Sequence, residues 1–197
     1  MKKSNLIKGG LAFSAFIVAI FITASCNSNV KAEDRKEVAE KQNESKFDTQ
    51  KKKDDAQFLV DASEVNLKGI LLGQLAQERG GSAHVRELGL MLEGEHIKMQ
   101  KELTLLAKSK SITIPTAPTN VAQEKHTMLK KKSGDDFDIA YADMMVKKHQ
   151  DVIEVFEDAS ENCDDEAIKE WAKQSLPVLQ KHLKHSIKCQ KECVSKV

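Results

Sequence analysis

The stretch SAHVRELGLMLEGEHIKMQKELTLLAK, residues 82–108, decides the fold class of this 197-residue chain. Its apolar residues recur every three or four positions, which is the period of one face of an α-helix. His96 falls near the middle of that face, where the pattern would place a leucine. Ser82 is a suitable N-cap, so we predict a helix that starts there and ends near Lys108. The face is formed by Val85, Leu88, Leu92, Met99, Leu103 and Leu106.

The same helical period returns in three further stretches, and strand signals are scarce. A short helix is also expected inside the connection that contains Pro115 and Pro118. Four long helices with short, long and short connections predict an all-α, ferritin-like four-helix bundle with a long connection between the second and third long helices. The other long helices are predicted over residues 54–77, 135–161 and 164–196.

The first 25 residues have the parts of a secretory signal peptide. Lysines 2, 3 and 8 precede an apolar run over residues 11–24, and small residues lead into Cys26. A cysteine at this point is where lipoprotein processing cleaves and acylates, so we predict a lipid-anchored Cys26. An uncleaved signal anchor is the alternative. Asn27 favours delivery to the outer membrane, with the domain on its periplasmic or surface face.

Residues 26–53 are polar and contain almost no apolar side chain to bury. This composition predicts a flexible tether, followed by one domain over residues 54–197. The formal net charge of the whole chain is only +1. Nucleic-acid-binding domains usually carry a basic surplus on one face, so no nucleic-acid partner is expected. The expected partner is the membrane, through the acylated cysteine, and the sequence indicates neither a protein partner nor an oligomeric state.

Three histidines occupy the inward faces of three different predicted helices. His149 and His182 lie near the midpoints of their helices, as His96 does. Midpoints of similar-length helices share one level in a bundle, so the imidazoles are expected to converge. One interpretation is three core histidines that Tyr141, Asp138, backbone carbonyls or water satisfy.

The other interpretation is a metal site, because neutral imidazole is the commonest transition-metal ligand. Three imidazoles around one point can hold zinc, copper, iron or manganese with one position left open. Asp138 and Tyr141 would then hydrogen-bond the outer ring nitrogens and orient the ligands. A pH-sensitive core is a third interpretation.

Four segments of the chain carry a family resemblance. They are NLKGILLGQLAQERG, VRELGLMLEGEHIKMQKEL, SGDDFDIAYADMMVKKHQDVIEVFE and LPVLQKHLKHS, and they span about residues 54–186. In this order and spacing they resemble the bacterial family known as domain of unknown function 4142, of the ferritin-like superfamily. The family's motif residues fall here on His96, Phe137, Asp138, His149, Leu176, Pro177 and His182.

Gly69 departs from this family pattern, which usually has a glutamate in the first long helix at that point. A carboxylate facing three imidazoles would add a ligand, so its loss argues against a metal centre here. Diiron proteins of this architecture also need Glu-x-x-His pairs on two helices. Only Glu93 and His96 have that spacing, and Glu93 points off the inward face, so diiron chemistry is not expected.

The remaining cysteines are Cys163, Cys189 and Cys193. His185, Cys189 and Cys193 follow at intervals of four on the last predicted helix, so they form a weaker second candidate metal site. Buried thiols or a local Cys189 to Cys193 disulfide are the alternatives. No arrangement for nucleophilic catalysis or phosphate binding is recognisable.

Two functions therefore stay open. The first is a non-enzymatic envelope lipoprotein with a structural, stress-related or partner-binding bundle. The second is a transition-metal-binding or metal-dependent redox protein that uses the histidine layer in its core.

Overall fold

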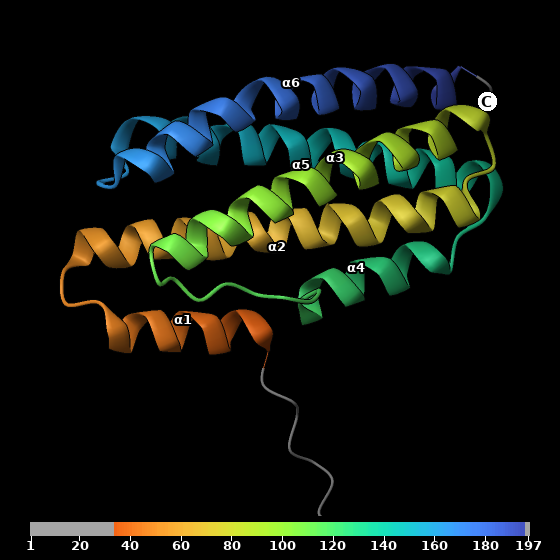
Figure 1. The fold of residues 1–197 in the computed structure, drawn as a ribbon. Coiled ribbons are helices and arrows are strands. Elements are labelled where there is room, and N and C mark those ends of the chain that lie inside the picture. Colours follow the sequence, from red (N-terminus) through yellow and green to blue (C-terminus); the bar gives the residue numbers. More distant parts are fainter. Residues whose placement is uncertain (1–33, 196–197) are drawn as a thin grey trace, which may run out of the picture. The chain divides into compact units, whose positions relative to one another are not determined.

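The computed structural model describes residues 34–195, so the predicted signal peptide and Cys26 lie outside the described residues. Over the described range every regular element is a helix (Figure 1). None of these helices combines the length and apolar character that crossing a membrane requires. The helices are α1 (Arg35–Lys46), α2 (Gln50–Arg79), α3 (Ala83–Ser109), α4 (Asn120–Lys130), α5 (Gly134–Asn162) and α6 (Glu166–Val194).

The four long helices form two hairpins, α2 with α3 and α5 with α6. Their ends follow local capping chemistry. The Ser82 hydroxyl accepts a hydrogen bond from the backbone N–H of Val85 at the start of α3. Asp165 caps α6 in the same way through the N–H groups of Ala167 and Ile168. The prediction of an all-α bundle is confirmed, and helix α6 continues through Pro177.

The long connection between α3 and α5 crosses the length of the bundle (Figure 1). Asp138, in the first turns of α5, accepts hydrogen bonds from the N–H groups of Gly81 and Ser82 at 2.8 and 2.7 Å. Helices α3 and α5 therefore begin at the same end, and residues 110–133 return the chain to it. This long connection is a crossover, which one class of four-helix bundle contains.

In each hairpin one aspartate accepts hydrogen bonds from backbone N–H groups in the turn of the other hairpin. Asp55 of α2 accepts from the N–H groups of Asp164 and Asp165 at 2.9 and 2.8 Å, at the turn between α5 and α6. Asp138 does the same at the other turn. Asp138 follows Asp55 by 83 residues (138 − 55), and Asp164 follows Gly81 by the same interval (164 − 81). Each turn is thus held by the other hairpin, a symmetry that the sequence analysis did not detect.

The flexible-tether prediction is wrong for residues 34–53, which form α1 and the first turn of α2. Asn43 of α1 is buried and bonds both the carbonyl and the N–H of Thr113, each at 2.8 Å. Lys36 forms ion pairs with Asp61 and Glu64 of α2. These polar contacts with the rest of the bundle hold α1 in place, so the domain begins before residue 54.

A polar layer at mid-height divides the core into two apolar clusters. One cluster is centred on Phe58, Phe156 and Trp171, and the other contains Phe137 and Tyr141. On each long helix the switch from one cluster to the other passes a buried polar side chain. These are Asn66 on α2, His96 on α3, His149 on α5 and His182 on α6.

Candidate metal centre

The three histidines of this layer meet in the core, as their positions in the helices predict. One ring nitrogen of each lies within 4.8 Å of those of the other two. Ring centroids are separated by 5.0 Å for His96 and His182, 5.2 Å for His149 and His182, and 5.9 Å for His96 and His149. Over residues 34–195 this is the one cluster of three or more histidine, cysteine or acidic side chains with such geometry.

Each imidazole is oriented by one hydrogen bond that a ring nitrogen makes. Nδ1–H of His96 donates to Oδ1 of Asn66 at 3.0 Å, and Nδ1–H of His149 donates to the carbonyl of Met145 at 2.8 Å. Nε2–H of His182 donates to the Glu95 carboxylate at 2.8 Å. Carbonyl and carboxylate oxygens accept only, so these contacts place the proton on the bonded nitrogen. The second nitrogen of each ring then carries a lone pair.

These lone pairs have no donor in the described part of the chain. Nδ1 of His182 is fully buried and without a hydrogen-bond partner there. No hydrogen bond from residues 34–195 reaches Nε2 of His96 or His149 either. Buried polar atoms usually find a partner, because an unsatisfied one costs about 1–3 kcal/mol. The layer therefore presents three ring nitrogens without a protein donor in the described residues, and of these Nδ1 of His182 is fully buried while His96 and His149 line the cavity.

At neutral pH these unpartnered ring nitrogens do not carry protons, because the pKa values of the three histidines are lowered. Burial lowers the pKa of His96 well below its usual value, and the neighbouring His182 and His149 lower it further. Burial also lowers the pKa of His149, against the bond to the Met145 carbonyl. Burial lowers the pKa of His182 to about 3, and the neighbouring His149, Lys181 and His185 lower it further. The rings are neutral, which is the form that binds metals.

Gly69 belongs to this layer because its missing side chain leaves the space that the His96 ring occupies. A Cβ atom at Gly69 would lie 2.2 Å from Cδ2 and 2.6 Å from Nε2 of His96. Any larger residue forces the ring to move, since real Cβ contacts are not this short. The position that seemed to lack a family carboxylate is therefore occupied by the His96 imidazole.

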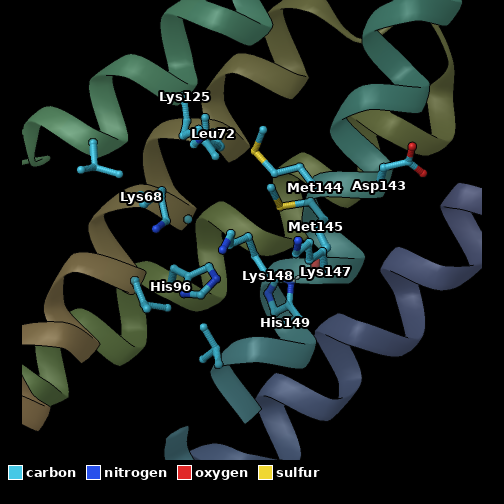
Figure 2. A pocket seen from close by; sticks show the side chains of 14 residues that line it. Lys68, Leu72, His96, Lys125, Asp143, Met144, Met145, Lys147, Lys148 and His149 are labelled. Carbon is cyan, nitrogen blue, oxygen red and sulfur yellow. Dashed lines mark hydrogen bonds between the residues drawn. The ribbon is translucent and has the colours of Figure 1, made fainter. Parts of the chain in front are cut away.

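A cavity of about 470 Å³ opens beside the layer, between α2, α4 and α5 (Figure 2). His96 and His149 line it, with Gly69, while His182 is not among the lining residues. Figure 2 shows both rings at this opening, with the side chains of Lys68 and Lys148 beside them. Two of the three imidazoles are thus reachable from the cavity. Its apolar lining is Val65, Leu72, Val121, Met144, Met145 and Val152.

The structure does not bring Asp138 or Tyr141, which were expected to orient the ligands, to the three imidazoles. Both oxygens of Asp138 are engaged by the turn before α3, three helical turns from His149. Tyr141 stacks on Phe137 with 5.9 Å between ring centroids, and its hydroxyl has no partner within residues 34–195. Helix rotation sends both side chains into the apolar cluster and the turn rather than toward the imidazoles.

The second candidate site on α6 is not assembled. His185 is exposed, whereas Cys189 and Cys193 are buried, and the three do not form a metal-binding cluster within the described residues. Burial raises the pKa of the Cys189 thiol to about 12, so the thiol stays protonated and binds metal poorly. Cys163, Cys189 and Cys193 form no disulfide, so the Cys189 to Cys193 bridge is not present in the described residues. Glu93 bonds Gln74 and Gln77 and stays away from the layer, as expected.

Comparison with known families matches the chain to the family described as domain of unknown function (DUF4142), over residues 40–188. The chain belongs to the DUF4142 family. The DUF4142 match begins within α1 and ends near the end of α6, so it includes all three histidines. No curated protein and no solved structure matched the chain.

Sequence reasoning missed Asn66 and Glu95, the side chains that orient two of the imidazoles in this DUF4142 domain. Asn66 could have been predicted from the sequence, because it is a polar residue one helical turn before Gly69 on the inward face of α2. Glu95 had none, because its role depends on the rotation of α3 against α6. Only packing brings Glu95 to His182.

Proposed function

We propose that this protein binds one transition-metal ion at His96, His149 and His182. The observation that carries the proposal is the set of three outer hydrogen bonds, to Asn66, Met145 and Glu95. Histidines that ligate metals almost always donate their other N–H to a carboxylate, a carbonyl or water. Here all three rings do so, and one ring nitrogen of each lies within 4.8 Å of those of the other two.

The competing account treats these residues as ordinary core histidines. A satisfied core histidine uses both ring nitrogens, whereas each of these rings uses one. Three neutral rings with adjacent lone pairs also repel one another. A cation relieves both effects, and the low pKa of the rings disfavours a proton in that role. A metal ion accounts for the arrangement better than packing does.

The donor set favours a borderline divalent metal. Three neutral nitrogens without a thiolate suit Zn²⁺, Co²⁺, Ni²⁺ or Cu²⁺ better than Mn²⁺, Mg²⁺ or Ca²⁺, which prefer oxygen. Tetrahedral zinc with bonds of ~2.0 Å keeps its nitrogens about 3.3 Å apart, so the layer contracts slightly on binding. Three protein ligands leave a fourth position for water or another small ligand, as in catalytic sites.

Thermal melting with and without zinc tests the proposal. Zinc at 100 times its dissociation constant should stabilise the folded chain by about 2.7 kcal/mol and raise its melting temperature. His149→Leu should remove this response. His185→Leu, an exposed histidine on α6, should keep it. An equal response of wild type and His149→Leu would reject the triad as the site.

We also propose that the protein is an envelope lipoprotein anchored to the outer membrane through Cys26. The signal-like segment and its terminal cysteine support this proposal. Labelling cells with a fatty-acid analogue should mark the wild-type chain and leave Cys26→Ala unmarked. Label retained by Cys26→Ala would reject the assignment of the anchor.

A further inference from the structure

The cavity beside the histidine layer is lined by positively charged side chains as well as by histidines and apolar residues. Four lysines line it, and one carboxylate, Asp143, stands against them. Asp143 already accepts a hydrogen bond from Gln190. Charge is thus concentrated here, although the net charge of the whole chain is only +1. The lysines are Lys68, Lys125, Lys147 and Lys148.

Among these lysines, Lys68 gives the strongest indication that the cavity binds an anion. It is partly buried, and no ion pair joins it to any residue within 34–195. Burial lowers the pKa of Lys68, the nearby Glu64 opposes this effect, and the positive charges of Lys148, Lys36 and Lys125 add to it. Glu64, the nearby carboxylate, is already paired with Lys36 at 2.9 Å. A desolvated cation among like charges is unfavourable unless an anion joins it.

The same charges act on a metal ion in the layer. The three imidazoles are neutral, so a divalent ion would keep its full charge beside the lysines. Glu95 offsets part of that charge, but it is shared with Lys181 at 2.5 Å. An anion in the cavity would meet the metal and the lysines together, because His96 and His149 line the same space as Lys68 (Figure 2).

The apolar side chains that line the cavity indicate which class of anion it would bind. Apolar atoms form most of the lining surface, and six of the lining residues are valine, leucine or methionine side chains of α2, α4 and α5. Apolar walls with a few placed polar groups are typical of sites for organic ligands. A bare inorganic anion would leave these walls uncovered.

We propose that the cavity binds an organic carboxylate, whose apolar part packs between α2 and α5 and whose carboxylate meets both Lys68 and the metal at His96 and His149. This inference rests on the proposed metal site and assigns its fourth ligand. Because the two ligands share favourable contacts, each must raise the affinity of the other by the same factor.

Cobalt binding to the full chain, measured with and without benzoate, tests the inference. Co²⁺ reports its coordination through visible absorption, and benzoate carries a carboxylate on an apolar ring. Benzoate should increase Co²⁺ affinity by about tenfold, within the usual range of coupling between sites. It should also alter the cobalt spectrum. Benzamide, a neutral molecule of similar shape, should do neither.

Variants separate the lysine contribution from general effects. Lys68→Met should reduce the benzoate effect to less than about twofold while Co²⁺ still binds. Lys101→Met, an exposed lysine on α3, should keep the full effect. Circular dichroism checks that both variants stay helical.

Three results of the Co²⁺ titration would contradict the proposed carboxylate site. Normal Co²⁺ binding without a benzoate effect would overturn the carboxylate site and leave the metal site standing. Equal effects of benzoate and benzamide would show that charge is irrelevant and would also overturn it. Absence of Co²⁺ binding to the wild-type chain would reject the metal site itself, and the coupling with it.

Discussion

The Glu95 carboxylate on α3 lies 2.8 Å from Nε2 of His182 on α6. This bond joins the two helical hairpins at the level of the histidine layer and fixes the protonated nitrogen of a fully buried ring. The carboxylate also makes the ring a stronger donor to a metal, because it holds part of the charge that coordination creates.

Glu95→Gln should therefore weaken zinc binding by about 10- to 100-fold, since glutamine can accept the same bond but carries no charge. Isothermal titration with zinc measures the change. Glu102→Gln, an exposed position on α3, provides the control and should bind as the wild type does. An unchanged affinity in Glu95→Gln would remove Glu95 from the account of the site.

Gly69→Ala should damage the site without touching a ligand atom. The added Cβ would lie 2.2 Å from His96, so the ring must shift. We expect a loss of about 1–3 kcal/mol in the free energy of unfolding of the metal-free protein, together with weaker zinc binding. Urea denaturation and zinc titration measure the two effects.

Gly94→Ala is the matched control, because no atom lies within 4 Å of a Cβ built at that position. It should stabilise α3 by about 0.5–1 kcal/mol, the usual gain for alanine over glycine in a helix. Stabilisation by Gly69→Ala as well would show that His96 has room to move.

The helices could be predicted from sequence because each long helix has a regular apolar face. Convergence of the histidines followed from their positions near helix midpoints. Helix α1 could not be predicted in this way, since Asn43 and Lys36 hold it through polar contacts that leave no apolar period. The role of Gly69 was also hidden, because it depends on where His96 places its ring.

The stability of the metal-free protein should fall as the pH decreases from 7.5 to 5. His96 and His149 have lowered pKa values in the folded state, so the unfolded chain takes up protons first, below its pKa of about 6.5. Proton uptake by the unfolded state favours unfolding. Urea denaturation with a chelator present, at both pH values, measures the loss.

His149→Leu should lose less stability over the same pH interval, because one of the shifted groups is absent. This interval lies above the range in which ordinary carboxylates titrate. A free energy of unfolding that stays constant or rises toward pH 5 would contradict the neutral state of the rings.

Asp138→Asn should separate stability from metal binding. The substitution weakens two hydrogen bonds between a carboxylate and the turn before α3, so we expect a loss of about 1.5–3 kcal/mol in the free energy of unfolding. Zinc affinity should change by less than about twofold. Asp135→Asn, exposed in the same helical turn, should alter neither quantity. Loss of zinc binding in Asp138→Asn would show that Asp138 orients the metal ligands, which its contacts with Gly81 and Ser82 do not support.

The central claim is that one metal ion binds to the three core histidines, and metal stoichiometry after equilibrium dialysis at pH 7 tests it most directly. The chain has six histidines, so the three outside the layer provide the control. We predict one zinc ion per chain for the wild type and for a variant with glutamine at His84, His126 and His185. A variant with leucine at His96, His149 and His182 should retain none. Equal zinc content in the two variants, or none in the wild type, would contradict the account.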